Sequence, residues 1–227
     1  MLFKDYTVDK FILELSSDAP SPGGGSTAAL VAALSSSLNS MVYSLTIGKK
    51  VFEKLSDNEK NKMVKLQEEA KEFIKKAQNF MEQDRDDFLS LMDSYKLPKN
   101  NEEEIIIRKE KIKENTMKAM KTPLLLAEEC IKFYDNIEFA IKHGNKNLIS
   151  DAGVATVLLH SAIESSIINV KVNLNFLKEE EFCEEIENKC KSILNISYVK
   201  KCNLMNEVEN IIYPKKYSLK RDYIFLR

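Results

Sequence analysis

Apolar residues recur at intervals of three and four along almost the whole chain, and no stretch alternates apolar and polar residues between hairpin turns. That spacing gathers apolar side chains on one side of an α-helix, whereas a strand needs a period of two. The pattern predicts an all-α fold: a single-domain antiparallel helical bundle with about seven helices, several of them long. We treat residues 1–227 as one domain, because no linker or internal repeat divides them.

Local signals place the ends of these helices. Ser26 is a candidate N-cap for the second helix, and Ser56 with Glu59 has the spacing of a capping box that starts the third. Thr122-Pro123 offers an N-cap and a first-turn proline for a fifth helix that ends at Gly144. The predicted helices cover about residues 8–15, 27–45, 56–95, 102–120, 123–144, 150–177 and 180–212.

Two of these helices have informative apolar faces. The helix over 27–45 is apolar nearly all round and rich in alanine and serine, which is typical of a central helix that neighbours or a ligand approach closely. The helix over 56–95 carries an apolar stripe in which Asp84 is the single charged member. Because a buried carboxyl group tends to have a raised pKa, Asp84 is a candidate general acid or base.

Simpler explanations of Asp84 are equally open. The carboxylate could pair with a Lys or Arg of a facing helix, or the stripe could become exposed near its end. Asp87 lies three residues on, on nearly the same face, and two carboxylates this close could share a proton. We favour a solvated edge position for Asp87.

Composition and charge narrow the classes of partner. The 227 residues suffice to bury a large core, and 44% apolar with 30% charged residues is usual for a folded globular protein. Lys and Arg number 34 against 35 Asp and Glu, so no net field attracts nucleic acid or acidic lipid. Uninterrupted apolar runs are short, and no basic-then-apolar export signal opens the chain. We expect a cytoplasmic protein with no nucleic-acid and no membrane partner.

Cysteine and histidine give no metal pattern. The cysteines show no CxxC spacing, and His143 and His160 are the two histidines of the chain. We therefore expect no metal site, and we expect reduced cysteines that pack as small hydrophobic residues, namely Cys130, Cys183, Cys190 and Cys202.

Three of the six glycines and two of the five prolines fall within residues 20–25, directly before the apolar second helix. Glycine costs folding free energy, so this cluster indicates a close approach of the backbone to a ligand. The run 23–28 formally fits GxGxxA, but no strand precedes it, and the chain has no Walker sequence. What remains is a loop of N–H groups suited to a carbonyl or carboxylate, with a plain tight turn as the alternative.

Polar side chains gather again near the start of the sixth helix and further along it. Asn145 and Asp151 belong to the first group, where Asp151 could simply stabilise the helix start. Asn169 and Asn173 lie four residues apart among apolar neighbours. Because buried amides need hydrogen-bond partners, these two either tie helices together or contact a polar heterocycle.

These clusters together resemble a known family. The resemblance rests on four places: Pro20–Ser26 leading into Ser40–Lys50; Asp84–Phe88 with Tyr95–Lys99; Thr122–Leu124 with Ala127-Glu128; and Gly144–Asp151 leading to Asn169–Leu174. In order and spacing they are similar to the cyclodeaminase family, which comprises the cyclodeaminase domain of formiminotransferase-cyclodeaminase and free-standing methenyltetrahydrofolate cyclohydrolases. The resemblance covers about residues 5–185, and the tail over 214–227 is not matched.

The resemblance implies a helical bundle that forms a homodimer and binds a folate substrate, with or without a polyglutamate tail, in a cleft. It implies no metal and no other cofactor. It maps the catalytic aspartate onto Asp84, and it places Asp151 and Asn169 at the pterin and Lys49 near the glutamate tail. The remaining implied contacts are Gly23, Gly24, Gly25, Ser26 and Asn145. This chain departs from the family pattern at Asp87, where alanine is usual, and at Ser35 and Ser36, where glycine and alanine are common.

By that resemblance the expected activity is that of a formiminotetrahydrofolate cyclodeaminase, which converts 5-formiminotetrahydrofolate to 5,10-methenyltetrahydrofolate and ammonia. Asp84 would relay the protons. The alternative within the family is a methenyltetrahydrofolate cyclohydrolase that gives 10-formyltetrahydrofolate. An alternative of another class is a non-catalytic helical adaptor, which would bind no folate.

Overall fold

The computed structural model describes residues 1–177 and 180–214, and within these ranges it contains helices and no strand. The tail that the resemblance does not match lies, after Pro214, outside the described residues. The short 3₁₀ helices are η1 (Phe3–Asp5) and η2 (Lys146–Leu148), and the α-helices are α1 (Val8–Leu15), α2 (Gly24–Ser44), α3 (Lys50–Glu53), α4 (Asp57–Tyr95), α5 (Glu102–His143), α6 (Ile149–Phe176) and α7 (Cys183–Ile212). The all-α prediction is confirmed.

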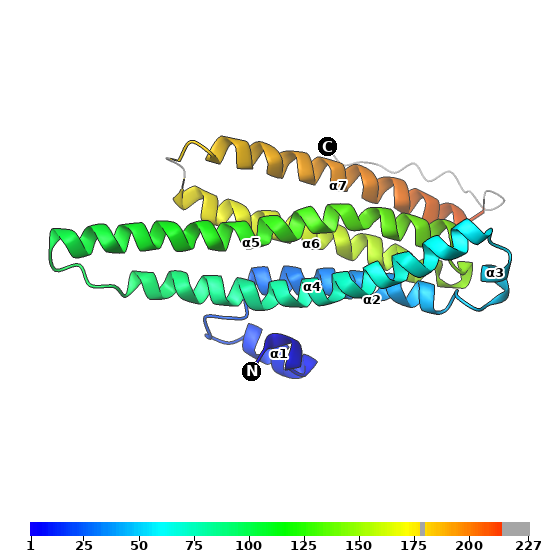
Figure 1. Cartoon of the computed structure of the whole chain (residues 1–227), viewed down its shortest axis with the longest axis horizontal. Helices are drawn as coiled ribbons and strands as arrows, with labels where there is room; N and C mark the ends of the chain where they lie inside the picture. Colours follow the sequence, from blue (N-terminus) through cyan, green and yellow to red (C-terminus); the bar gives the residue numbers. More distant parts are fainter. Residues whose placement is uncertain (178–179, 215–227) are drawn as a thin grey trace.

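Four long helices form the body of the molecule. Figure 1 shows α2, α4, α5 and α6 running lengthwise beside one another, with α7 along one side and α1 on the outside. Each of the four packs mainly against two others, in the cyclic order α2, α4, α5, α6, with a smaller contact between α2 and α5, and α7 packs on α6 and α5. We call the half of the bundle nearer the α4–α5 connection the first end, and the half nearer α3 and η2 the second end.

The apolar stripe predicted over residues 56–95 lies on one helix, α4, as expected. The capping box of Ser56 and Glu59 is formed at the start of α4. Along this helix, apolar members of the stripe such as Met63, Ala70 and Phe73 are buried. The stripe therefore faces the core and carries Asp84 to the first end of the bundle.

One helix runs through the point at which the sequence predicted two. We expected separate helices before and after Thr122-Pro123, but α5 is continuous over 42 residues with Pro123 inside it. A proline within a helix leaves the carbonyl four residues earlier without its usual N–H donor. Here the Asn173 side-chain Nδ2 of α6 donates to that carbonyl, on Ala119, at 3.1 Å. A tertiary contact thus satisfies the group that the proline leaves unpaired.

The start of α2 also differs from the prediction. Gly23, not Ser26, is the N-cap residue, and Ser26 lies inside the first turn. The Ser26 hydroxyl bonds to α4 instead of to its own helix start. A further short helix, α3, lies between the predicted helices over 27–45 and 56–95, where we predicted none.

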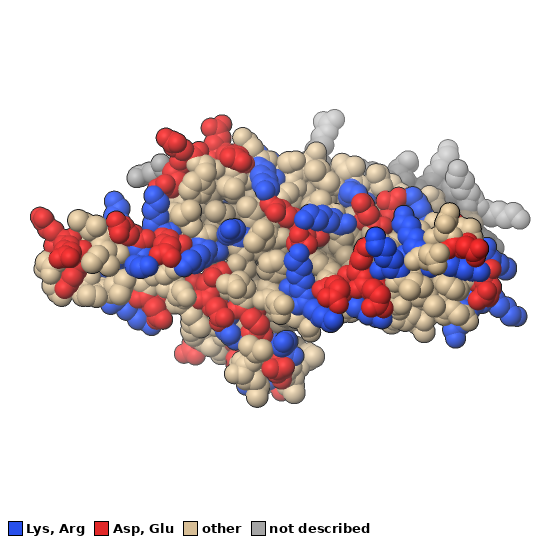
Figure 2. Space-filling model, in the orientation of Figure 1, with Lys and Arg blue, Asp and Glu red and all other residues tan. Residues whose placement is uncertain are grey.

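The region Lys146–Phe176, which includes α6, is long and apolar enough by length and composition to cross a membrane, and half of its most apolar stretch is buried. In the bundle this helix packs against α2, α5 and α7. Contacts with three neighbours account for much of its apolar character. Figure 2 shows positive and negative side chains interspersed over the visible face, in keeping with the balanced charge of the sequence.

Candidate functional site

A pocket of about 480 Å³ opens at the first end of the bundle. The loop before α2 and the first residues of α2 form one wall, α4 and α6 form two others, and α5 contributes Ala119. Its polar groups include Asp84 and the amides of Asn169 and Asn173. We call this cavity the Asp84 pocket.

The Asp84 carboxylate lies directly against the glycine loop. Ser26 Oγ donates a hydrogen bond to Asp84 Oδ2 at 2.9 Å and also lies 3.2 Å from the carbonyl oxygen of Met81. A Cβ atom on Gly25 would lie 1.9 Å from Asp84 Oδ1, which no side chain can tolerate. Glycine is therefore required at position 25 because it allows α2 to reach the carboxyl group.

Burial raises the pKa of Asp84 above its ordinary value. The hydrogen bonds from Ser26 oppose this effect, and the nearby charge of Asp87 adds to it. A carboxyl group with a raised pKa holds and releases a proton closer to neutral pH than an ordinary aspartate does. Asp84 is thus suited to act as a general acid or base.

An ion pair does not explain Asp84. The neighbouring Arg85 is engaged with Glu82 at 2.7 Å and with Asp86 at 2.8 Å. Among the described residues, Asp84 makes no salt bridge within 4.0 Å, and its side-chain partner is Ser26. The alternative of a carboxylate neutralised by a facing helix is therefore not supported.

Asp87 corrects one of our predictions. We favoured a solvated edge position, but the side chain is buried, with 7% exposure. It accepts hydrogen bonds from Thr122 Oγ1 at 2.6 Å and from Gln83 Nε2 at 2.8 Å. Thr122 lies inside the continuous helix α5, and its hydroxyl bonds to Asp87 instead of capping a helix start as predicted.

The two asparagines of α6 have different roles in the pocket wall. Asn169 Nδ2 donates to the carbonyl of Ser165 at 2.8 Å, and a Cβ atom on Gly24 would lie 3.2 Å from Asn169 Oδ1. Asn173 joins helices through Ala119, so for this residue the structural explanation holds. The Asn169 carboxamide as a whole lies against Gly24, since the same Cβ atom would lie 3.3 Å from Asn169 Nδ2.

The structure divides the predicted site residues into two groups. Gly23, Gly24, Gly25, Ser26, Asp84 and Asn169 come together at the first end. Lys49, Asn145 and Asp151 lie at the second end, where Lys49 precedes α3, the Asn145 backbone N–H donates to Thr46 Oγ1, and Asp151 is in the first turn of α6. Asp151 and Asn169 are separated by 18 residues of helix, or about 27 Å. Within one chain these groups do not form one site.

The sequence analysis missed the aromatic part of the pocket. Phe88 and Tyr95 of α4 and Phe176 of α6 line it. The first two continue the Asp84 stripe, so their spacing was a usable signal. Phe176 ends a different helix, and no local pattern connects it with Asp84.

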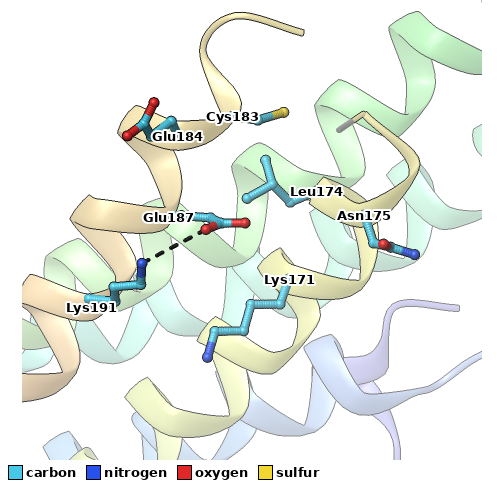
Figure 3. A pocket seen from close by; sticks show the side chains of 7 residues that line it. All are labelled: Lys171, Leu174, Asn175, Cys183, Glu184, Glu187 and Lys191. Atoms are coloured by element: carbon cyan, nitrogen blue, oxygen red, sulfur yellow. Dashed lines mark ion pairs between the residues drawn. The ribbon is translucent and has the colours of Figure 1, made fainter. Parts of the chain in front are cut away.

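A second hollow, of about 510 Å³, lies between the last turns of α6 and the first turns of α7. Figure 3 shows its walls, including Lys171 and Leu174 from α6 and the ion pair of Lys191 with Glu187, at 3.9 Å, from α7. It contains none of the predicted site residues. The Asp84 pocket is the better candidate for chemistry.

The Asp84 pocket combines a carboxyl group of raised pKa, a carboxamide and aromatic walls on an all-helical scaffold. Such a site suits proton transfer on a flat polar heterocycle. A profile of the formiminotransferase-cyclodeaminase family matches residues 7–192, so the chain belongs to this family.

Individual relatives agree with this assignment. Methenyltetrahydrofolate cyclohydrolase of Methylorubrum extorquens is 36% identical over 186 residues, which cover 79% of this chain and 84% of that protein. Formimidoyltransferase-cyclodeaminase of Rattus norvegicus is 28% identical over 84% of this chain, but the match covers 34% of that protein. The crystal structure of a formiminotetrahydrofolate cyclodeaminase from Thermotoga maritima has the same fold, with a TM-score of 0.72 over 92% of this chain and 96% of that chain at 22% identity. The family predicted from sequence is confirmed.

Proposed function

We propose that this chain is a formiminotetrahydrofolate cyclodeaminase that uses Asp84 as its acid and base. The observation that carries the proposal is the Asp84 carboxyl group, with its raised pKa, held against the glycine loop in a chain of this family. The family membership favours an enzyme over the adaptor alternative. A non-catalytic adaptor would also not need a buried Asp84 carboxyl group packed against Gly25.

In the proposed reaction, N10 of 5-formiminotetrahydrofolate attacks the formimino carbon and loses a proton. The former imino nitrogen, which already carries one hydrogen, gains this proton and a second proton from the solvent, and it leaves as ammonia when its bond to the carbon breaks. The product is 5,10-methenyltetrahydrofolate. Asp84 takes the proton from N10 and returns it to the departing nitrogen. Such proton transfer by a positioned side chain raises the reaction rate roughly a hundred to ten thousand fold. Ser26 holds the carboxyl group in place, and Asn169 accepts a hydrogen bond from the pterin.

The first test replaces the carboxyl group by an amide of the same shape. We expect Asp84→Asn to lose turnover by roughly a hundredfold or more, because the amide cannot relay protons. Tetrahydrofolate should still raise its melting temperature, because the pocket keeps its shape. Asp93→Asn, an exposed aspartate on the same helix, is the matched control. Full activity of Asp84→Asn would exclude this role.

A second candidate is methenyltetrahydrofolate cyclohydrolase, favoured by the 36% identity to an enzyme of that name over 84% of its length. The same carboxyl group would then help water to attack the methenyl carbon. Purified protein should be given 5-formiminotetrahydrofolate to follow the appearance of the methenyl chromophore, and methenyltetrahydrofolate to follow its loss above the spontaneous rate. If neither reaction occurs and folates leave the melting temperature unchanged, the adaptor alternative stands.

We further propose that the protein acts as a cytoplasmic homodimer without a metal or other cofactor. The exposed apolar side chains on α2, on its C-cap residue Leu45 and on α6 support the dimer: Leu34, Met41, Leu45, Val154, Val157 and Ile168. These two helices pack against each other, so a second copy could cover both. An antiparallel pairing would also bring the second end of one chain, with Lys49 and Asp151, towards the Asp84 pocket of its partner.

A further inference from the structure

We propose that a smaller cavity beside the Asp84 pocket binds the carboxylates of the substrate's glutamyl tail through Lys109 and Lys113. The proposal rests on the proposed folate function. It assigns the tail to a part of the molecule different from the one that the resemblance indicated, namely Lys49.

The two cavities adjoin. The smaller one has a volume of about 280 Å³ and shares Tyr95 and Phe176 with the Asp84 pocket. Both rings are substantially exposed, at 41% and 68%. A ligand that fills the Asp84 pocket and extends past these two rings enters the smaller cavity directly.

Two helices lead from one cavity to the other. On α4 the wall runs from Asp84 through Phe88 to Tyr95, a distance of about 16 Å along the helix. On α5 the same face carries Ala119 in the Asp84 pocket and then Thr116 and Lys113 in the smaller cavity. The path changes from a carboxyl and amide end, over an apolar aromatic stretch, to a cationic end. This order matches a pterin, an aminobenzoyl ring and a glutamate.

The cationic end contains two ammonium groups on one face of α5. Lys109 and Lys113 are four residues apart and both line the smaller cavity. Lys113 Nζ lies 2.6 Å from Glu180 Oε1, and the two side chains are 49% and 31% exposed. This pair shows that Lys113 can hold a carboxylate at this position. A glutamyl carboxylate would share or replace Glu180, while Lys109 offers a second ammonium group.

Lys49 is poorly placed for this task within one chain. It lies before α3 at the second end, at the opposite end of the 21-residue helix α2 from the glycine loop. The helix alone separates these points by about 30 Å. Only a Lys49 contributed by the second copy of a dimer could compete with Lys109 and Lys113, and the test includes that case.

The experiment compares mono- and triglutamate forms of whichever substrate the wild-type protein turns over. We expect the wild-type protein to show a lower KM for the triglutamate than for the monoglutamate, and we call the ratio of the two KM values the advantage. In the double variant K109Q/K113Q this ratio should fall about two- to tenfold, the size expected for the loss of two exposed ion pairs. The advantage of the wild-type protein should also shrink as salt is raised. K65Q/K75Q, which removes two exposed lysines of α4, is the matched control and should keep the advantage.

Several results would overturn the subsite. These are a wild-type protein with equal KM for the two forms, a K109Q/K113Q variant that keeps the advantage, and loss of the advantage in K49Q instead. Melting curves of each variant show whether the fold is kept. A wild-type protein that turns over neither folate contradicts the proposed function itself, so the two failures are distinguishable.

Discussion

At the scale of single residues, the contact between Gly25 and Asp84 explains why glycine is needed at the start of α2. Residues 23–25 are half of the glycines in the chain, yet they meet different surroundings. A Cβ on Gly25 would collide with Asp84, one on Gly24 would press on Asn169, and one on Gly23 would meet nothing within 4 Å. The sequence predicted a close approach by this loop. The group approached most closely is a carboxyl group of the protein.

This difference predicts unequal effects of alanine. Gly25→Ala should lower kcat/KM at least tenfold, because the new methyl group must push α2 or the carboxyl group out of position. Gly23→Ala adds the same methyl group in open space and should stay within about twofold of the wild type. Steady-state kinetics and melting temperatures of both variants check this. Equal effects of the two substitutions would contradict the contact.

The buried Asp87 predicts a change in pH dependence. Burial is the main cause of the raised pKa of Asp84, and the charge of Asp87 raises it further. Asp87→Asn removes that charge, and Thr122 can still donate to the amide oxygen, so the pKa of Asp84 falls. The limb of the pH–rate profile that reports Asp84 should move to lower pH. Asp93→Asn should leave it in place, and an unmoved or raised limb in Asp87→Asn would refute the coupling.

At the scale of elements, periodicity predicted which segments are helices, and local end signals predicted some boundaries wrongly. The helix over Val8–Leu15 and the capping box at Ser56 are as predicted. The signal at Thr122-Pro123 is equally strong locally, but no helix starts there. The helix continues through Pro123 because Asn173 of α6 donates to the carbonyl that the proline leaves unpaired. Ser26 has the composition of a cap and is used by another helix. Boundaries that depend on facing helices could not be predicted from the segment alone.

The Pro123 site predicts a measurable coupling between α5 and α6. Asn173→Ala leaves the Ala119 carbonyl unpartnered and should cost about 1–3 kcal/mol of unfolding free energy. In a Pro123→Ala background the residue at 123 regains an N–H that reaches this carbonyl, so the same substitution should cost at least about 0.5 kcal/mol less. Urea unfolding of the four proteins gives the cycle. Additive costs would show that Asn173 does not replace the missing donor.

At the scale of the whole molecule, the resemblance implied one cleft for all of the site residues, and it could not predict their division between the two ends. Residue patterns alone singled out the glycine run and Asp84 as separate candidates. Lys49, Asn145 and Asp151 are assigned by resemblance, and their distance from Asp84 depends on the lengths and directions of α2 and α6. Helix lengths give the distances between these residues only when it is known which helices pack side by side and in which direction each one runs.

The proposed dimer predicts a change of mass on substitution at the α2–α6 face. Wild-type protein should elute in light-scattering chromatography at twice the 26.0 kDa chain mass. The exposed Leu34 contributes to this face, so Leu34→Glu should shift the protein towards monomer by placing a charge in an apolar interface. Ile106→Glu, at an exposed apolar position of α5, is the control. A monomeric wild type, or a variant Leu34→Glu with unchanged mass, would count against this interface.

The walls of the Asp84 pocket are drawn from residue 20 to residue 176, across four helices. No fragment that stops before α6 can form all of these walls, so the pocket exists only once about three quarters of the chain has been synthesised and packed. Under the proposed function, a bound folate would contact four helices at once. Its binding would therefore stabilise the protein against global unfolding more than against fraying of a single helix end. In this architecture, occupancy of the pocket reports that the bundle has been assembled.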